Sequence, residues 1–127
     1  MRIIDSNLII YFAVSGFEWL NDHIQTADAC YSKITKVEVL GYQKISQSAV
    51  AFFQVYFDSI TSLALTDEIL EKAIKLRQLK KMSLGDSIIA ATALVHDFDL
   101  YTHNVADFIG IPDLRVIDPI PSGTKVT

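Results

Sequence analysis

Apolar runs and helix-like segments alternate along the chain. A short apolar run at 2–4 ends in a polar cluster at 5–7, and apolar residues at 8–14 then follow with helical spacing. Another helical segment reaches to about 25, and a second apolar run covers 29–34. These patterns predict a strand, a turn and helical segments, followed by a second strand.

The rest of the chain repeats this alternation. Thr35, Thr66 and Ser83 are candidate N-caps for helices, and the segment 88–95 is apolar almost all round. The predicted helices begin at 35, at about 46, at 66 and at 83; the predicted strands cover 59–65, 100–102 and 114–117, with a helical turn at 104–108. Strands that alternate with helices in this way predict an α/β fold, in which helices cover both faces of a mainly parallel sheet of about five strands. We expect one domain over 1–118 and a loose tail over 119–127.

Composition agrees with one folded domain. The chain has 127 residues, of which 50% are hydrophobic and 20% charged, enough to bury one core but not two. Cys30 is the only cysteine, so no internal disulfide can form, and a reducing cytoplasmic setting is expected. The apolar start is interrupted at Asp5, and no apolar run approaches the roughly 18 residues of a membrane span; neither a secretion signal nor a membrane anchor is expected.

The net charge of −4 gives no general attraction for nucleic acids, so such binding would have to be local. Five cations fall within ten residues: Lys72, Lys75, Arg77, Lys80 and Lys81. One interpretation is a patch that contacts a polyanion. The other is a solvated helix face with i,i+4 ion pairs, whose last cations suit a helix C-terminus.

Four acidic residues follow strands or begin helices, and they are Asp5, Glu38, Asp86 and Asp107. In a parallel α/β sheet these positions meet at the edge where ligands bind. Carboxylates about 4 Å apart repel by roughly 1 to 4 kcal/mol per pair, so a cluster of them requires a cation. With no histidine or cysteine at ligand spacing, oxygen ligands favour Mg²⁺, with Mn²⁺ as a substitute, over zinc.

Helix capping is the alternative explanation for three of these acids. Thr35, Ser83 and Asn104 each precede an acid by three residues, as in a capping box. Asp5 could be a turn residue that bonds to its own backbone. Taken singly, each acid fits capping; taken together, they fit a metal site.

Four segments, 3–9, 34–41, 84–94 and 100–108, together resemble a PIN domain, and more narrowly a VapC-type toxin of a type II toxin-antitoxin pair. The resemblance implies a three-layer α/β/α sandwich and a Mg²⁺-dependent endoribonuclease with Asp5, Glu38, Asp86 and Asp107 as catalytic and metal-binding residues. It also implies a cognate antitoxin as partner.

Supporting polar positions of that family match Ser6, Thr102 and Asn104. Arg77, Lys80, Lys81 and His103 are candidate RNA contacts. A homodimer is expected, because the aromatic residues between 52 and 57 exceed what a small core needs.

Two other functions compete with this one. A haloacid-dehalogenase-type phosphatase would also place an acid after the first strand, but it needs a second acid two residues later, where this chain has Asn7. A catalytically silent PIN-like module that binds RNA or protein would keep the fold without the reaction.

Overall fold

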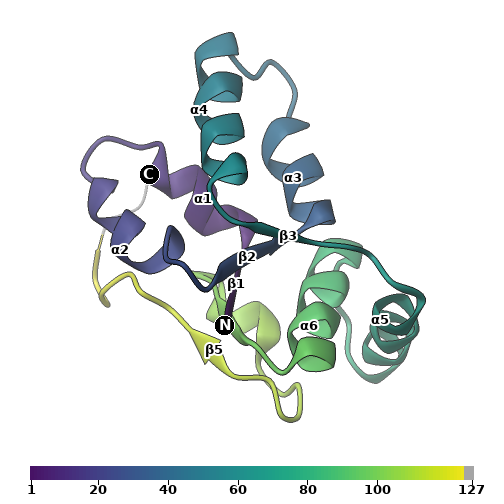
Figure 1. Ribbon diagram of the computed structural model, residues 1–127. Helices are drawn as coiled ribbons and strands as arrows, with labels where there is room; N and C mark the ends of the chain where they lie inside the picture. Colours follow the sequence, from purple (N-terminus) through teal and green to yellow (C-terminus); the bar gives the residue numbers. More distant parts are fainter. Residues whose placement is uncertain (125–127) are drawn as a thin grey trace.

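Five short parallel strands form the centre of the computed structural model, which describes residues 1–124 (Figure 1). They are β1 (Arg2–Ile4), β2 (Ala29–Ser32), β3 (Thr61–Leu63), β4 (Asp99–Tyr101) and β5 (Val116–Ile117). Their order is β3-β2-β1-β4-β5, and every neighbouring pair is parallel. The predicted α/β class and the sheet of about five strands are therefore confirmed.

Helices connect and cover the strands. They are α1 (Ser6–Phe12), η1 (Glu18–Leu20), α2 (Asn21–Ile24), α3 (Lys33–Leu40), α4 (Gln47–Asp58), α5 (Asp67–Leu79), α6 (Leu84–His96) and η2 (Val105–Phe108), where η marks a 3₁₀ helix. Within residues 1–124, no helix combines the length and the apolar character that crossing a bilayer requires.

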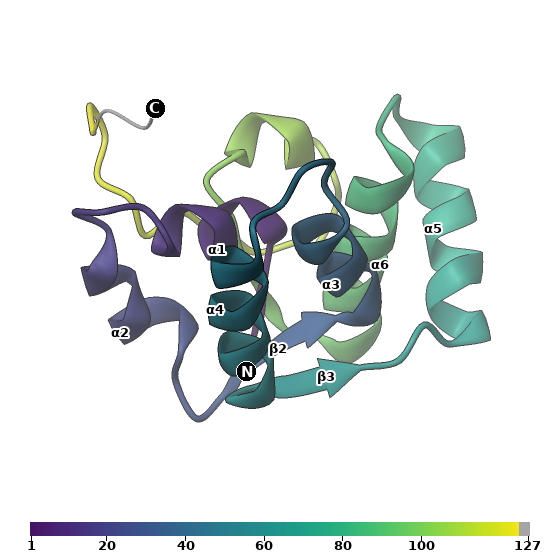
Figure 2. The same ribbon diagram turned by 90° about the horizontal axis from the view of Figure 1, so that it is seen from above.

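Adjacent residues of one strand serve opposite faces of the sheet, which produces three layers. Ile4 packs in a cluster with Leu8 of α1 and Phe57 of α4, whereas Ile3 packs in a second cluster with Ile89 of α6 and Ile69 of α5. This is the two-residue period of a strand. Figures 1 and 2 show the result: α1, α2 and α4 lie on one side of the sheet, and α6 lies on the other with α5 outside it.

Two of the three predicted N-caps are confirmed. The Thr66 hydroxyl accepts a hydrogen bond from the Ile69 N–H, and the Ser83 hydroxyl accepts one from the Asp86 N–H. The prediction for Thr35 was wrong, because β2 runs directly into α3 and Ser32 caps that helix instead. Thr35 lies inside α3, fully buried, and its hydroxyl has no hydrogen-bond partner among residues 1–124.

The C-terminal segment is packed for longer than predicted. Ile120 is 4% exposed and belongs to the same core cluster as Ile4, and its N–H donates to the Asp118 carboxylate at 2.9 Å. The segment predicted as a loose tail from 119 therefore begins with a buried anchor, because one apolar side chain finds space beside the core. Residues 125–127 of that segment lie outside the described part.

The aromatic residues of α4 are mostly core residues. Phe53, Tyr56 and Phe57 are each at most 2% exposed, while Phe52 is 41% exposed. The Tyr56 hydroxyl donates to the Ile24 carbonyl at 2.6 Å, which ties α4 to the end of α2. The excess of aromatics in the sequence is thus accounted for largely within one chain, and a homodimer stays a prediction.

Candidate active site at the carboxyl edge of the sheet

Asp5 lies directly after β1 and caps α1. Its backbone N–H donates to the Tyr101 carbonyl of the neighbouring strand β4, so the sheet itself holds the residue. One carboxylate oxygen, Oδ1, accepts the Ser6 N–H at 2.8 Å. With 4% exposure, Asp5 is a buried carboxylate at the centre of the sheet edge.

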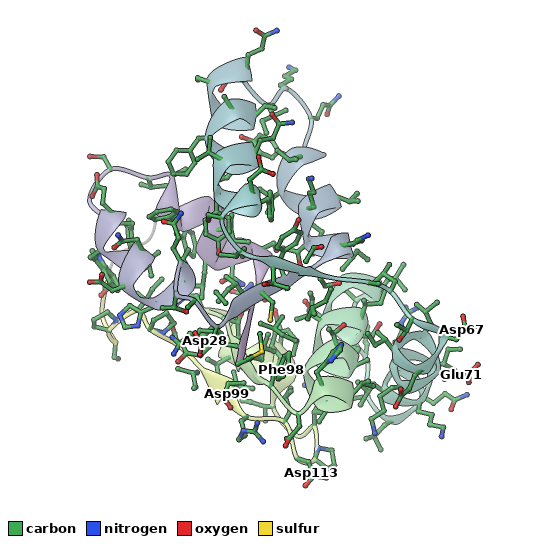
Figure 3. The ribbon with its side chains drawn as sticks, in the orientation of Figure 1. Asp28, Asp67, Glu71, Phe98, Asp99 and Asp113 are labelled. Carbon is green, nitrogen blue, oxygen red and sulfur yellow. The ribbon has the colours of Figure 1, made fainter. Side chains whose placement is uncertain are left out.

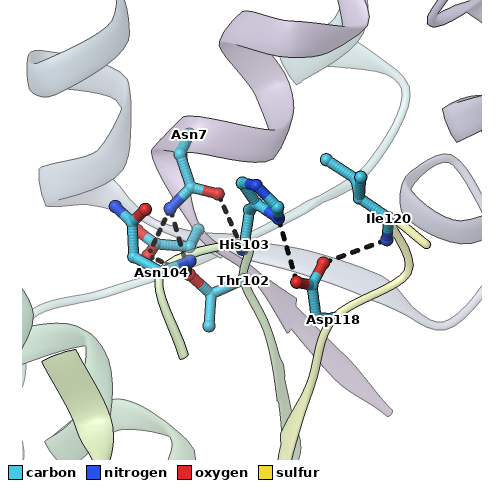
Figure 4. Close-up of polar contacts among 7 residues, drawn as sticks. Asn7, Thr102, His103, Asn104, Asp118 and Ile120 are labelled. Atoms are coloured by element: carbon cyan, nitrogen blue, oxygen red, sulfur yellow. Dashed lines mark hydrogen bonds and ion pairs between the residues drawn. The ribbon is translucent and has the colours of Figure 1, made fainter. Parts of the chain in front are cut away.

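Asn7 and Thr102 complete the bonds to Asp5 (Figure 4). Asp5 Oδ2 accepts the Thr102 hydroxyl at 2.8 Å and the Asn7 side-chain amide at 3.0 Å. The Asn7 amide also donates to the Thr102 hydroxyl, and Asn7 Oδ1 accepts the His103 N–H, both at 3.0 Å. Asn7 therefore fixes the end of β4 relative to α1, with Asp5 between them.

Glu38 approaches the site from α3, where it contacts the first turn of α6. A methyl group added at Gly85 would lie 2.8 Å from Glu38 Oε2, so the missing side chain of Gly85 makes room for this carboxylate. Contacts between α3 and α6 bring the two helices together at this point. Asp86 is the next residue of α6, which places it beside Glu38.

Asp86 and Asp107 form the outer half of the site. Asp86 is half-buried in the first turn of α6, and Asp107 is an exposed residue of η2. The Asp86 N–H makes the capping bond to the Ser83 hydroxyl at 3.1 Å, and the same hydroxyl lowers the pKa of the Asp86 carboxylate. Asn104 makes no side-chain capping bond at the start of η2. Capping therefore accounts for the Ser83 hydroxyl, but it does not account for Asp107.

Three of these carboxylates have raised pKa values. Burial raises the pKa of Asp5, and the charge of Asp86 raises it further, while the bonds from Thr102, Ser6 and Asn7 lower it. Much of Glu38 is exposed, yet partial burial of its carboxylate and the charges of Asp5 and Asp86 raise its pKa.

Asp86 links this inner group to Asp107. Burial raises the pKa of Asp86 and the nearby charge of Asp107 adds to the rise, whereas the Ser83 hydroxyl and the charge of Lys80 oppose it. The charge of Asp86 raises the pKa values of Asp5 and Glu38, and the charge of Asp107 raises that of Asp86. The four predicted acids thus form one electrostatically coupled row.

The donor chemistry of this row suits a hard divalent cation. All four groups are carboxylates, which are the ligands that Mg²⁺ and Mn²⁺ prefer. Within residues 1–124, however, no group of three or more His, Cys, Asp or Glu side chains is arranged so that it could hold a metal ion. The four carboxylates therefore have suitable chemistry, and ligation would require side-chain movements.

The basic residues predicted to contact RNA at the end of α5 differ in their surroundings. A surface hollow lined by Lys80, Lys81, Asp86 and Asp107 joins the end of α5 to the carboxylates. Arg77 is exposed in the last turn of α5, next to this hollow. Lys80 donates to two backbone carbonyls, those of Asp107 and Ile109, and its contact with RNA stays a prediction.

His103 is held at the other side of the site. Its Nδ1 lies 2.9 Å from Asp118 Oδ2, and its ring meets the ring of Tyr11 edge-on, with centroids 5.7 Å apart. Figure 4 shows Asp118 between His103 and the Ile120 N–H. The C-terminal segment thus orients a residue that directly follows Thr102.

Sequence reasoning missed three residues of this site: Asn7, Gly85 and Asp118. An amide two residues after Asp5 can both donate and accept hydrogen bonds, which was an available signal for Asn7. Gly85, in the first turn of a helix directly before an acid, was a second available signal. Asp118 carried no signal, because its pairing with His103 spans 15 residues.

The expected supporting residues differ in how they act. Thr102 bonds to Asp5 through its side chain. Ser6 and Asn104 donate through their backbone N–H groups, to Asp5 and to the Thr102 hydroxyl respectively. No side-chain hydrogen bond of Ser6 or Asn104 is found within residues 1–124, so their position in the backbone matters here more than their side-chain chemistry.

Acidic residues outside the site lie in a different environment. Asp67 and Glu71 project from α5 into solvent, and Asp113 lies exposed in the loop before β5 (Figure 3). Asp28 and Asp99 lie near the amino ends of the strands, where each pairs with an arginine. Proximity to other carboxylates, with raised pKa values at Asp5, Glu38 and Asp86, therefore distinguishes the carboxyl edge.

No protein-family model matches the chain, and no curated protein matches it in sequence. Solved structures do match. A chain of a toxin-antitoxin complex from Klebsiella pneumoniae is 29% identical, with a TM-score of 0.78, over 94% of this chain and 98% of that one. A chain of VapBC2 from Rickettsia felis, solved with a DNA fragment from the promoter, is 15% identical, with a TM-score of 0.77, over 92% and 97%.

A chain of VapBC-1 from nontypeable Haemophilus influenzae is also similar: it is 23% identical, with a TM-score of 0.74, over 92% of this chain and 96% of that one. At these lower identities the two VapBC structures establish the fold alone. Together with the Klebsiella pneumoniae complex, they confirm the resemblance noted in the sequence: the chain has the PIN-like fold of VapC-type toxins.

Proposed function

We propose that this VapC-like PIN fold is a Mg²⁺-dependent endoribonuclease that acts as the toxin of a toxin-antitoxin pair. The row of carboxylates at the carboxyl edge of the sheet carries the proposal. Burial and mutual repulsion raise the pKa values of Asp5, Glu38 and Asp86, so the site costs stability in the absence of a cation. Such a cost is expected where charge is kept for function rather than for folding.

Asp5, Glu38, Asp86 and Asp107 would hold the metal, which when bound polarises a phosphodiester and activates water. Asp5 is the fixed ligand, because the sheet and three hydrogen bonds hold it. Glu38 and Asp107 lie at the exposed ends of the row, where they can bind the cation directly or orient the attacking water.

RNA would reach the carboxylates along the hollow beside Lys81. The carboxylates repel phosphate until a cation is present, so the backbone of the RNA needs cations at the rim. Lys81 and Arg77 are exposed there, on the side of Asp86 and Asp107. His103, oriented by Asp118, offers a second contact on the opposite side of Asp5.

We extend the proposal to a small antitoxin as partner. The structure from Klebsiella pneumoniae is described as a toxin-antitoxin complex, and two others are VapBC complexes. This chain leaves Val55 69% exposed and Phe52 41% exposed on α4, beside Phe12 of α1. A short amphipathic segment of the antitoxin would cover this groove, and an arginine-bearing segment would suit the acidic edge.

Cleavage of structured RNAs by purified protein tests the activity. We expect cleavage with Mg²⁺ or Mn²⁺, none with excess EDTA, and none by Asp86→Asn protein purified identically. Cleavage that persists in EDTA, or that the Asp86→Asn protein retains, would refute the metal site. Binding of RNA without cleavage under every metal condition would favour the catalytically silent module.

A further inference from the structure

Lys80 lies between the two helices that flank the outer half of the site. It is the first residue beyond α5, and its backbone is extended there, with φ −149° and ψ 142°. α6 begins at Leu84, shortly after it, and carries Asp86. The Lys80 side chain points away from this connection toward η2, the turn that carries Asp107.

The ammonium of Lys80 makes two hydrogen bonds to η2. Nζ donates to the Asp107 carbonyl at 3.1 Å and to the Ile109 carbonyl at 2.6 Å. A short 3₁₀ helix leaves its last carbonyls without helical partners, and partial negative charge gathers at that end. Lys80 therefore caps the C-terminus of η2, a helix that begins 25 residues after it, rather than the C-terminus of its own helix α5.

The two bonds lie beside the outer half of the carboxylate row. Lys80, Asp86 and Asp107 line the same hollow. These two bonds from Lys80 to η2 form a clamp. Because one of them ends on the carbonyl of Asp107 itself, the clamp limits how far this residue can move from Asp86. An ammonium with two carbonyl acceptors is also less available to an RNA phosphate than that of its neighbour Lys81, for which no hydrogen bond is found within residues 1–124.

We propose that Lys80 is a positioning residue of the site: it fixes the η2 turn to the end of α5, which packs against α6, and so limits the separation of Asp107 and Asp86. The proposal deepens the proposed function and rests on it for its consequence, which is metal affinity. The clamp itself is a property of the metal-free protein. Residues that orient ligands without binding the ion typically contribute 10- to 100-fold to affinity or activity.

Three variants test the clamp: Lys80→Met, Lys80→Arg and Lys81→Met. Methionine keeps an apolar side chain without the ammonium, and Lys81→Met makes the same change of charge one residue away. In metal-free protein, Lys80→Met should accelerate amide hydrogen exchange across 105–109 by about 10-fold, as expected for the loss of charge-assisted hydrogen bonds. Lys81→Met should leave this exchange unchanged, and Lys80→Arg should restore most of the protection.

Calorimetric titration with Mn²⁺ then measures the consequence. We expect the dissociation constant to rise about 10-fold in Lys80→Met, to stay near the parent value in Lys81→Met, and to recover in Lys80→Arg. Equal effects of the two methionine variants would show that only net charge matters and would overturn the proposal, as would unchanged exchange in Lys80→Met. If the parent bound no Mn²⁺, the proposed function would fail, while the exchange measurement would still decide whether Lys80 clamps η2.

Discussion

Asp86→Asn and Ser83→Ala separate the two explanations of the sequence around the start of α6. In the structure, the capping bond joins the Ser83 hydroxyl to the Asp86 backbone N–H, so it survives Asp86→Asn and is lost in Ser83→Ala. Loss of such a cap costs about 0.5 to 2 kcal/mol of unfolding free energy. Ser83→Ala should therefore destabilise the protein by that amount in metal-free buffer.

The expected effect of Asp86→Asn is different in sign and in size. The substitution removes the repulsion between Asp86 and its neighbours Asp5, Glu38 and Asp107, which screening at this half-buried position limits to about 1 kcal/mol. It also removes a negative charge from the first turn of a helix, which costs about 0.3 to 1 kcal/mol. The two effects oppose each other, so the metal-free variant should be about as stable as the parent or slightly more stable.

Metal supplies the decisive contrast. At about 100 times its dissociation constant, Mn²⁺ should stabilise the parent by roughly 2.7 kcal/mol, a rise in Tm on the order of 10 °C for a chain of this size. Ser83→Ala should keep that rise, and Asp86→Asn should lose most of it. Thermal unfolding of the three proteins at pH 8, in EDTA and in saturating Mn²⁺, measures both effects. An equal rise in parent and Asp86→Asn, with the variant less stable throughout, would refute a role for Asp86 in metal binding.

Two further substitutions test the inner half of the site. Gly85→Ala adds a methyl group 2.8 Å from Glu38 Oε2, so the flexible carboxylate must move. The metal-free protein should be unchanged or up to about 1 kcal/mol more stable, because alanine favours a helix more than glycine does, while the rise in Tm with Mn²⁺ should shrink. An undiminished rise would contradict the contact. Thr102→Val removes a bond that lowers the pKa of Asp5, so the acidic limb of the rate profile should move to higher pH. The raised pKa values of Asp5 and Glu38 also predict how stability depends on pH, because they contribute stability at low pH that is lost as pH rises through them. Chemical denaturation of metal-free protein should therefore show this contribution to the free energy of unfolding falling toward neutral pH. Mn²⁺ should restore the lost stability.

The sequence predicted the elements of the fold because the local signals agree with the tertiary structure. Thr66 and Ser83 are the caps that their sequences indicate, and the apolar segment 88–95 is a buried helix. The order of strands could not be read in the same way. Placing β4 beside β1 depends on which hydrophobic surfaces pack together, and no pattern within either strand specifies a neighbour.

The errors at Thr35 and Ile120 have related causes. Ser32 and Thr35 are both good capping residues, and the choice between them depends on where pairing of β2 with β1 and β3 ends. Ile120 follows a proline in a polar segment, so its burial depends on a space between other elements. In each case a long-range contact decided between local alternatives that the sequence left open.

The candidate site was predictable to the level of its acids, but not to the level of how each is held. Asp5 is buried and bonded to three donors, whereas Asp107 is an exposed side chain on a four-residue turn. Because no group of three or more such side chains within residues 1–124 could hold a metal ion as they stand, the proposed ligation requires movement. Asp5 cannot supply that movement without breaking the bonds that bury it, so the movement must come from Glu38, Asp86 and Asp107. If the carboxylates hold a metal, Gly85, by the room it leaves for Glu38, and Lys80, by its two carbonyl bonds to η2, would control the metal affinity of the site without touching the ion.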